Sequence, residues 1–572
     1  MSAARDRDLT PLPDLLHDRP SAGPVRTRRP VYVDLLPPCN NACPAGEDIQ
    51  GWLAAVREND YARAFDILTQ DNPLPAVMGR VCYHPCEDAC NRCEFDDAVA
   101  IHAVERFIGD EAVRTGRQPR MAAIRPSGNR VLVIGAGPSG LSAAYHLARH
   151  GHQVEIRDAG AEPGGMMRYG IPAYRLPRDV LAQDIKRIAD LGVTFTMNHT
   201  VTDLNAERAG FDAVFVAVGA QASKHTEIPA RDASRIIDAV PFLRDVAAAA
   251  DSAEPAPGEV AVGRLVAGRR VAVYGGGNTA MDAARVATRL GAEETIIIYR
   301  RNRDKMPAHE EEAAAAEQEG VRINWLRTIT GFAAPSMRVE VMELDETGYP
   351  RPTGRFENLE ADTLILALGQ DAETAFLSEL PGIEFNRDGT VEVDEHMMTG
   401  CPGVFAGGDM VPAERTVTIS VGHGKKAARY IDDYLRKIIP VDRRKHELAE
   451  FGLLHPWYFA ESKQQEGAMR TVASRVTDFA EVVSGLTEDA AVGEAQRCLS
   501  CGNCFECDGC FGACPEDAVI QLGRGNRYEF DYDRCTGCGV CFEQCPVHAI
   551  EMVSEPASEA PTREALSREV LS

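Results

Sequence analysis

The chain has no long apolar run. No stretch reaches about 18 consecutive uncharged apolar residues, which a membrane-spanning helix needs, and no basic-then-apolar signal pattern opens the sequence. Basic residues are also scarce, because 61 Lys+Arg stand against 86 Asp+Glu and the net charge is −25. These shortages predict a cytoplasmic protein without a membrane span, and they argue against a nucleic-acid-binding surface.

Length and cysteine content point to several domains that hold metal. A chain of 572 residues is too long for one hydrophobic core, so about three to five domains are expected. Its 44% hydrophobic content is that of a globular protein. The 17 cysteines, many of them in C-x2-C spacing, favour metal ions or clusters over disulfides.

The first glycine-rich motif lies in Val131–Gly140, which reads V-L-V-I-G-A-G-P-S-G. It predicts a buried strand, a tight turn against a dinucleotide pyrophosphate and a helix. A second strand, Gln153 to Arg157, ends at Asp158, where an acid that binds a ribose hydroxyl is expected. Alone, such a motif could be an ordinary tight turn. The expected cofactor contacts are Gly135, Gly137, Pro138, Ser139, Gly140, Asp158, Gly165 and Gly219.

A second motif supports the first. Val271–Asp282 reads V-A-V-Y-G-G-G-N-T-A-M-D, and its second strand ends in Arg300 and Arg301 instead of an acid. Two arginines there suit a 2′-phosphate and hence NADP(H), although a solvated basic strand end is the alternative. Two dinucleotide sites predict one tightly held flavin, FAD, and one exchanging nicotinamide. The expected contacts are Gly275, Gly277, Asn278, Thr279, Ala280, Arg300, Arg301 and Gly369.

A third stretch predicts the return of the chain to the flavin. Val404 to Ala406 read as a strand that runs into two glycines and Asp409, which is placed to accept from a ribityl hydroxyl. A helix beginning near Thr418 would aim its N-terminus at the flavin. A simple turn aspartate is the alternative for Asp409. The expected contacts here are Gly408, Asp409 and Thr418.

Cysteines gather at both ends of the chain. Six lie around two predicted helices, Asp48–Arg57 and Tyr61–Leu68, where iron–sulfur ligation is favoured and zinc is the alternative. Two C-x2-C-x2-C-x3-C-P runs near the C-terminus have the bacterial two-cluster ferredoxin pattern, in which the fourth cysteine of each run serves the other cluster. One cluster is therefore expected on Cys504, Cys507, Cys510 and Cys545, and the other on Cys535, Cys538, Cys541 and Cys514.

The order of these motifs resembles the small (β) subunit of NADPH-dependent glutamate synthase. It is also similar to the N-terminal half of dihydropyrimidine dehydrogenase and to the large subunit of the bifurcating NADH-dependent ferredoxin:NADP oxidoreductase. The resemblance covers about residues 35 to 440, and the ferredoxin module looks more like relatives that serve 2-oxoacid:ferredoxin oxidoreductases. The matching stretches are Cys39-x3-Cys43-Pro44, Gly79–Cys82, Val131–Gly140, Tyr169–Pro177, Gly275–Asp282, Tyr299–Arg301 with Met306–Ala308, and Gly407–Asp409.

The resemblance implies two N-terminal [4Fe–4S] clusters, so four clusters in all. It places Cys43, Cys86, Cys90 and Glu105 on the cluster nearer the flavin, with a solvated helix carboxylate as the alternative for Glu105. The family also has a C-x2-C pair just before the cysteine that Cys39 matches, but residues 31–38 contain none. Our hypothesis is that Cys39 and Cys82 join an unassigned pair, Cys498 and Cys501. The alternative uses Cys93 and leaves that pair as bystanders.

The predicted fold is a multidomain α/β protein with two Rossmann-like, glutathione-reductase-like dinucleotide-binding domains, a helical iron–sulfur domain and a ferredoxin-like domain. Domain boundaries are expected at 1–30 (mobile arm), 31–127 (helical iron–sulfur domain), 128–260 (FAD, first part), 261–375 (NADP(H)), 376–440 (FAD, second part), 441–497 (helical connector), 498–553 (ferredoxin-like domain) and 554–572 (tail).

These domains leave no room for a second catalytic domain, and hydride transfer to a flavin needs no side-chain acid, base or nucleophile. The main interpretation is therefore an electron-transfer subunit that links NADP(H), FAD and the clusters to ferredoxin or a partner such as a 2-oxoacid:ferredoxin oxidoreductase. The alternatives are the small subunit of NADPH-dependent glutamate synthase, whose partner is an amidotransferase subunit, and a non-catalytic iron–sulfur scaffold.

Overall fold

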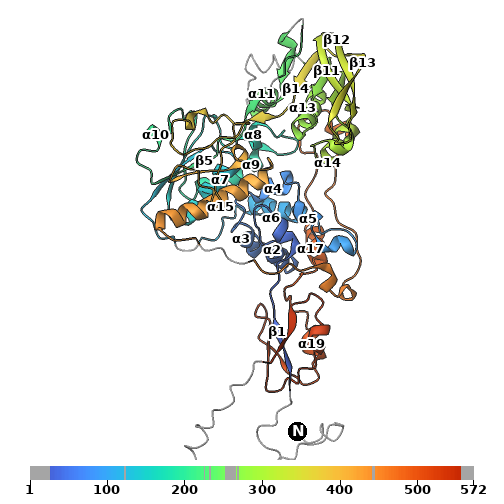
Figure 1. Ribbon diagram of the computed structural model, residues 1–572. Coiled ribbons are helices and arrows are strands. Elements are labelled where there is room, and N and C mark those ends of the chain that lie inside the picture. Colours follow the sequence, from blue (N-terminus) through green and yellow to red (C-terminus); the bar gives the residue numbers. More distant parts are fainter. Residues whose placement is uncertain are drawn as a thin grey trace, which may run out of the picture.

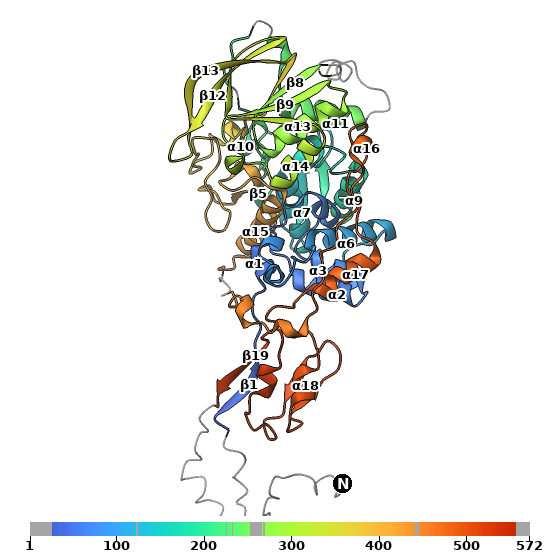
Figure 2. The same ribbon diagram turned by 90° about the vertical axis from the view of Figure 1, so that its right-hand side faces the viewer.

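The computed structural model describes residues 26–121, 124–224, 226–230, 233–251, 266, 269–440 and 445–555. Its parts follow one another along a long axis. The sheets of the second dinucleotide domain lie at one end, the first dinucleotide domain and the N-terminal helices in the middle, and the cysteine-rich C-terminal module at the other end (Figure 1). The view turned by 90° has the same order (Figure 2).

The N-terminal domain is a small set of helices with cysteines near their ends. Helices α2 (Ile49–Arg57) and α3 (Tyr61–Leu68) agree with the sequence prediction, and the side chains of Asp48 and Asp60 cap their N-termini. Trp52 of α2 is fully buried in the domain core. The other helices are α1 (Pro38–Ala42), α4 (Pro75–Val81), α5 (Pro85–Asp88) and α6 (Ile101–Thr115).

The first dinucleotide domain is built on a parallel five-stranded sheet in the order β16-β5-β2-β3-β4. Its central strand β2 carries the aliphatic run before the first glycine turn, and these residues are buried. The strands are β2 (Arg130–Ile134), β3 (Gln153–Arg157), β4 (Thr194–Thr196), β5 (Ala213–Val216) and β16 (Val404–Ala406). The helices are α7 (Pro138–Arg149), α8 (Met166–Tyr169), α9 (Arg178–Ala189), α10 (Leu204–Glu207) and α15 (Val417–Arg436).

The second dinucleotide domain combines a parallel sheet, in the order β10-β9-β8-β14-β7, with an antiparallel sheet of β11, β12 and β13. Its parallel strands are β7 (Ile236–Asp238), β8 (Arg270–Tyr274), β9 (Glu294–Tyr299), β10 (Arg322–Trp325) and β14 (Thr363–Leu366). The antiparallel strands are β11 (Arg327–Ala333), β12 (Ser336–Leu344) and β13 (Pro350–Glu360). The helices are α11 (Ala239–Asp251), α13 (Asn278–Arg289) and α14 (Glu310–Gln318).

One predicted boundary is wrong. The second dinucleotide domain was expected to begin at residue 261, but β7 pairs in parallel with β14 and so already belongs to the sheet of that domain. Helix α11, which follows β7, likewise lies within residues 128–260, which were expected to form the first part of the FAD domain. The chain passes from the first dinucleotide domain to the second after β5 and returns after β14. At these two passages β6 (Ala222–Ser223) and β15 (Gln370–Asp371) form a short antiparallel pair.

The connector and the chain ends also differ from expectation. Residues 445–497 are mostly irregular, and their α-helices are α16 (Val472–Arg475) and α17 (Glu488–Arg497). The expected arm of residues 1–30 contributes part of strand β1 (Arg28–Tyr32), which pairs with β19 (Ile550–Ser554), so Ser554 of the expected tail is also ordered in a sheet. Residues 1–25 and 556–572 lie outside the described residues.

The C-terminal module has the two-fold repeated pattern that its cysteine runs predict. Each run is followed by a short strand, β17 (Val519–Gln521) or β19. The remaining elements are α18 (Gly509–Ala513), β18 (Tyr528–Phe530) and α19 (Val540–Glu543). Across the ranges that the structure describes, no helix combines the length and apolarity needed to cross a bilayer.

Candidate functional site

The first glycine turn leaves an open cradle at the N-terminus of α7. At Gly135, whose φ is +106°, a Cβ would lie 2.2 Å from the Ala217 carbonyl oxygen, and at Gly140 it would lie 1.9 Å from that of Gly135. A Cβ on Gly137 would instead meet nothing within 4 Å. The close contacts pack the helix on the strand, while the open side fits a pyrophosphate at a helix N-terminus.

Asp158 is held at the end of β3 by two backbone amides. Its Oδ2 accepts a hydrogen bond from Ala136 N at 2.6 Å, and its Oδ1 accepts one from Gly160 N at 2.6 Å. The carboxylate borders a cavity of about 790 Å³ that Gly135, His199 and other residues also line. The cavity and the fixed carboxylate fit the adenosine end of a dinucleotide, as the spacing predicts.

A second cavity, of about 170 Å³, lies where the two glycine turns meet. Residues from both dinucleotide domains line it, so two cofactors bound to the two turns would approach each other here. The predicted contacts that border this cavity are Gly137, Pro138, Ser139, Asp158, Gly165, Gly219, Asn278, Thr279, Gly408 and Asp409.

Helix α15 begins at this cavity, as expected. Thr416 caps the helix by accepting a hydrogen bond from Ile419 N at 3.2 Å. The Ser420 hydroxyl donates to Asp409 Oδ1 at 3.2 Å, and burial raises the pKa of Asp409. The Ser139 hydroxyl, which also borders the cavity, is buried without a hydrogen-bond partner among the described residues. A polar atom left unpaired in this way fits a polar ligand.

The second glycine turn repeats this geometry. A Cβ on Gly275 would lie 2.1 Å from the Ala367 carbonyl oxygen, whereas one on Gly277 would meet nothing within 4 Å. The side chain of Asn278 accepts from His309 N at 3.0 Å and ties the turn to the loop before α14. This turn therefore also fits a pyrophosphate. Ala280 lies in the first turn of α13, and Gly369 follows β14 with a φ of +105°.

The two arginines after β9 differ in environment. Arg300 is exposed, which leaves the solvated interpretation open for that residue. Arg301 is half-buried, and its Nε is buried without a hydrogen-bond partner in the part of the chain that the structure describes. A buried guanidinium donor with no acceptor is costly in a folded protein, so it fits a phosphate at this strand end.

Arg175 joins three domains beside the second cavity. Its guanidinium forms ion pairs with Asp282 at 2.9 Å and Glu312 at 2.5 Å, both in the second dinucleotide domain, and it donates to the Tyr83 hydroxyl at 3.5 Å. The Tyr83 ring stacks on His309, with ring centroids 3.4 Å apart. These contacts fix how the two glycine turns face each other. Arg175 belongs to a stretch quoted above, although the sequence alone assigned it no role.

One group of thiols faces the first dinucleotide domain. The hydroxyl of Thr418, in the first turn of α15, donates to Cys82 Sγ at 3.1 Å instead of bordering the cavity as a cofactor contact. Burial raises the pKa of Cys82 to about 12, and the nearby Glu105 carboxylate adds to this shift. Burial also raises the pKa of Cys86, and Cys82 and Cys43 add to that shift. This group contains Cys43, Cys82, Cys86 and Glu105.

Glu105 is buried, with 5% of its surface exposed, so the solvated-carboxylate alternative is wrong. The Asn72 amide donates to Glu105 Oε1 at 2.7 Å and to Glu47 Oε1 at 3.0 Å. Burial raises the pKa of Glu105 well above its usual range and that of Glu47 to about 7. A buried carboxylate among thiols fits a ligand of an iron–sulfur cluster. Sequence reasoning missed Asn72 and Glu47, although Glu47 closely follows Cys43.

The second group corrects the expected ligand sets. Burial raises the pKa of Cys39, and the thiols of Cys498, Cys90 and Cys501 raise it further, so these four side chains lie together. Cys82 was expected in this group and Cys90 in the other. The structure exchanges the two, because Cys82 contacts α15 while Cys90 lies beside Cys39.

The C-terminal cysteines lie close together, and one of the two expected crossings between the runs can be followed. Burial raises the pKa of Cys504 to about 11, and the thiols of Cys510 and Cys545 add to this shift, so the second run's last cysteine does lie with the first run. Burial also raises the pKa of Cys541 to about 12, with Cys510, Cys535 and Cys538 as further causes. The amides of Ala518 and Ala549 donate to Cys514 Sγ and Cys545 Sγ, each at 3.3 Å, at matching positions in the two runs.

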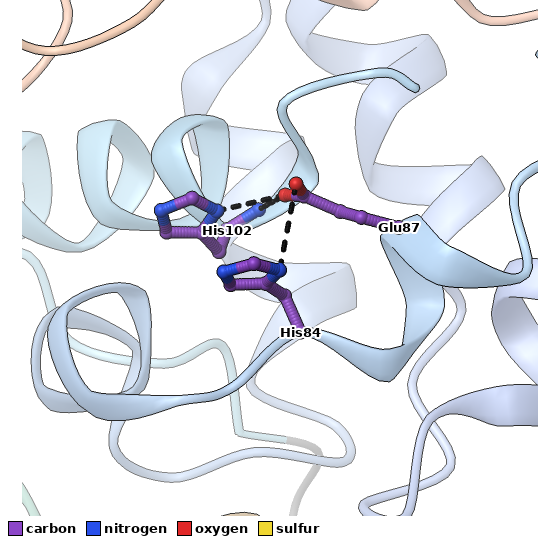
Figure 3. Close-up of side chains that lie close together, drawn as sticks. All are labelled: His84, Glu87 and His102. Carbon is purple, nitrogen blue, oxygen red and sulfur yellow. Dashed lines mark hydrogen bonds and ion pairs between the residues drawn. The ribbon is translucent and has the colours of Figure 1, made fainter. Parts of the chain in front are cut away.

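A histidine–carboxylate cluster is formed by His84, which precedes α5, Glu87 of α5 and His102 of α6 (Figure 3). Glu87 Oε1 accepts hydrogen bonds from the backbone N of His102 at 2.9 Å and from its Nδ1 at 2.8 Å, and the rings of His84 and His102 stack 4.3 Å apart. The possible metal-ligand atoms of His84, Glu87 and His102 all lie within 4.8 Å of one another. His84 also pairs with Glu311 of α14 at 3.7 Å. The cluster thus joins the thiol-bearing loop to the second dinucleotide domain.

These features define a class: an oxidoreductase with two dinucleotide-binding domains and iron–sulfur domains at both ends. The chain belongs to the pyridine nucleotide-disulphide oxidoreductase family, whose model matches residues 129–424. Residues 34–117 match the model of dihydropyrimidine dehydrogenase domain II with its 4Fe-4S cluster, and residues 528–551 match a 4Fe-4S binding domain. The chain is therefore an NAD(P)H-linked, flavin- and iron–sulfur-dependent oxidoreductase of the type of the glutamate synthase small chain.

Three relatives are similar to this chain over most of its length. The β subunit of the NADP(+)-dependent formate dehydrogenase of Moorella thermoacetica is 38% identical and aligns over 81% of this chain and 70% of its own. The β subunit of the NADPH-Fe(3+) oxidoreductase of Geobacter sulfurreducens is 33% identical, over 81% and 75%. The small chain of glutamate synthase [NADPH] of Escherichia coli is 32% identical, over 74% and 98%.

The contact between Thr418 and Cys82 predicts an effect on reduction potential. We expect Thr418→Val to lower the midpoint potential of the cluster nearest the flavin, because a hydrogen bond to a ligand sulfur stabilises the more negative, reduced state. One such bond contributes about 1 kcal/mol, equivalent to about 40 mV for one electron. A redox titration followed by electron paramagnetic resonance measures the shift. Thr418→Ser keeps the hydroxyl and serves as the control, and equal potentials in both variants would contradict the assignment.

Proposed function

We propose that this chain is the NADP(H)-facing β-type subunit of a larger enzyme, and that it passes electrons between NADP(H) and a partner subunit through FAD and four [4Fe–4S] clusters. The observation that carries the proposal is one continuous series of contacts. Both glycine turns open on the same cavity, α15 begins at that cavity, and its first turn donates a hydrogen bond to Cys82.

A bound flavin exchanges a hydride with nicotinamide and single electrons with iron–sulfur centres, which is chemistry the protein itself lacks. The chain's own residues bind and orient. The open side of Gly137 receives one pyrophosphate and that of Gly277 the other, and Arg301 offers its unpaired donor to the 2′-phosphate. The N-terminus of α15 supports negative charge at the flavin edge of the cavity.

Arg175 and its partners set the approach of the two cofactors. Because its ion pairs with Asp282 and Glu312 are largely shielded from solvent, they hold the second dinucleotide domain against the flavin domain at close range. Good orientation of a hydride donor and acceptor removes much of the entropic barrier. The stacked Tyr83 and His309 rings cover the same junction and help to exclude water from it.

The partner supplies the substrate chemistry. The relatives named above include β subunits of a formate dehydrogenase and of an iron(III) reductase, together with a glutamate synthase small chain. They support the glutamate synthase small-subunit type of assembly better than the expected 2-oxoacid oxidoreductase. The second candidate function is that of the glutamate synthase subunit itself. The match over 98% of the E. coli small chain favours this function, and the C-terminal ferredoxin module argues against it.

Isolation of the complex under anaerobic conditions, followed by native mass and subunit identification, tests the proposal. A large dehydrogenase partner would support a formate dehydrogenase-like assembly, and an amidotransferase partner would support glutamate synthase. Thiamine-diphosphate subunits would support a 2-oxoacid:ferredoxin oxidoreductase. Rapid mixing with NADPH should bleach the flavin first and the clusters afterwards. The proposal would be overturned if the chain were isolated without a partner and NADPH did not reduce its flavin.

The ferredoxin module is the proposed exit to the partner, and Cys538 is its exposed cysteine. We expect Cys538→Ser to slow electron delivery to the partner at least tenfold, about 1.4 kcal/mol in the barrier, while reduction of the flavin by NADPH keeps its rate. The matched control is Cys93→Ser, another exposed cysteine that the proposal gives no cluster. Unchanged turnover of the complex with Cys538→Ser would place the exit elsewhere.

A further inference from the structure

The two ends of the chain meet around Cys498 and Cys501. Helix α17, which ends just before Cys498, docks on the N-terminal domain through buried charges: Glu494 accepts from Ala100 N at 2.9 Å, and Arg497 donates to Ala98 O at 2.8 Å. Arg92 of the N-terminal domain donates in turn to the carbonyl oxygen of Arg497. The backbone that carries Cys498 is therefore held against the N-terminal helices.

Cys501 accepts hydrogen bonds from two side chains of the N-terminal domain. The amide of Asn91, which directly follows Cys90, donates to Cys501 Sγ at 3.5 Å. The amide of Gln50, in α2, donates to the carbonyl oxygen of Cys501 at 3.1 Å. Gln50 N also donates to the side chain of Asn40, the neighbour of Cys39, at 3.2 Å. The neighbour of Cys90 thus contacts Cys501 directly, and the neighbour of Cys39 is linked to Cys501 through Gln50.

The segment before Cys39 lies where it can hold this arrangement in place. Leu35 N donates to Gly502 O at 3.1 Å, and Asn503 returns a hydrogen bond to Leu35 O at 3.1 Å. Gly502 has a φ of +74°, and a Cβ there would lie 2.4 Å from that of Leu35, so the two backbones are in close contact. The segment has no cysteine of its own but positions the pair from the C-terminal end.

We infer that Cys39, Cys90, Cys498 and Cys501 hold one [4Fe–4S] cluster shared by the two ends of the chain. Two of these ligands, Cys498 and Cys501, lie outside both ranges that match 4Fe-4S domains, 34–117 and 528–551. Four thiolates gathered in a packed interior need a cation to offset their mutual repulsion, and four cysteines are the ligand set of such a cluster.

The ligand inventory closes with this site. Apart from Cys93 and Cys401, the 17 cysteines together with Glu105 give four donors to each of four clusters. Cys93 is exposed and donates to Glu87 O at 3.5 Å, and Cys401 is buried in the flavin domain beside Arg208. The shared cluster also has a place in the path, because Cys501 closely precedes Cys504, the first ligand of the ferredoxin module.

The site couples the two terminal regions in folding. Because a cluster bound by both regions exists only when they are docked, its binding free energy stabilises the docked arrangement. The inference rests on the proposed cluster chemistry but not on nicotinamide binding, so iron content and flavin reduction report on the two separately.

Iron and spectroscopic analysis of the anaerobically purified full chain with Cys498→Ser tests the site. We expect a loss of one to four iron atoms per chain, with one set of cluster signals lost or converted to a three-iron form. Cys90→Ser should remove the same signals, and the double variant should lose no more than a single variant that has lost the whole cluster. Cys401→Ser is the matched control with full iron, and Cys93→Ser should also keep its iron.

Full iron and unchanged spectra in Cys498→Ser would overturn the inference, as would loss of different signals in Cys498→Ser and Cys90→Ser. If a variant fails to fold, alkylation of the wild-type holoprotein gives the answer. Cys39, Cys90, Cys498 and Cys501 should resist the reagent together and become reactive together after iron chelation. If Cys498 and Cys501 became reactive toward the reagent independently of Cys39 and Cys90, the shared cluster would be contradicted. Slow flavin reduction by NADPH with full iron would instead contradict the proposed function alone.

Discussion

The Gly137→Val variant is expected to fold but to lose its flavin. Gly137 has extended backbone, with φ −77° and ψ −176°, which a β-branched residue adopts without strain, and a Cβ there meets nothing within 4 Å. The space that is open in the protein is the space that the pyrophosphate would occupy. Overpacking by a few methyl groups costs about 1–3 kcal/mol, so flavin affinity should fall about 10- to 100-fold.

Flavin content per folded chain, measured from the absorption spectrum after gel filtration, checks this expectation. Gly277→Val is the matched variant in the second turn, and it should keep the yellow colour while losing reduction by NADPH. Gly140→Ala should behave differently, because its Cβ would lie 1.9 Å from the Gly135 carbonyl oxygen and the fold itself would be strained. A Gly137→Val protein with full flavin would show that the first turn does not bind the pyrophosphate.

Local patterns were enough to predict these turns. In each, strand, glycines and helix lie within about 20 residues of sequence, and the close contacts that require glycine are made within the motif or with the adjacent strand. The ferredoxin runs are local in the same sense, since their spacing sets which thiols can share a cluster. Crossing of Cys545 to the first run also follows from that spacing.

The partition of the N-terminal cysteines could not be predicted from spacing. Cys82, Cys86 and Cys90 recur every fourth residue, which in one continuous helix would place them on one face. The chain does not form that helix, because α4 ends at Val81, His84 adopts a left-handed φ of +37°, and α5 ends at Asp88. The three thiols are therefore not on one helix face, and Cys90 lies beside Cys39.

The boundary of the second dinucleotide domain was predicted wrongly for a related reason. Strand β7 is only three residues long, and its sequence carries no sign of which sheet it joins. Its partner β14 lies more than a hundred residues further along the chain, so the pairing is set by tertiary packing and not by local propensity. The carboxylates around Glu105 illustrate the same limit, since Asn72 becomes their shared donor only when α6 packs in the fold.

Replacing both Arg300 and Arg301 with serine is expected to lower kcat/KM for NADPH about 10- to 100-fold and to leave that for NADH nearly unchanged. Each charge-assisted hydrogen bond to a phosphate contributes about 1.5–3 kcal/mol, and Arg301 has a buried Nε with no acceptor among the described residues. The 2′-phosphate is the only part of the cofactor that the two arginines would distinguish. Serine leaves space and hydroxyl donors without the charge.

Steady-state reduction of a dye by both nicotinamides, at several salt concentrations, measures this preference. Arg303→Ser is the control, because the Arg303 guanidinium pairs at the surface with Glu310 and Glu317, so its charge is already offset by two carboxylates. Salt should weaken NADPH binding in the wild type more than in the double variant, since screening acts on the lost charges. An equal loss with NADH and NADPH would mean that the two arginines support the strand and not the phosphate, and the preference for NADP(H) would then have no basis in this turn.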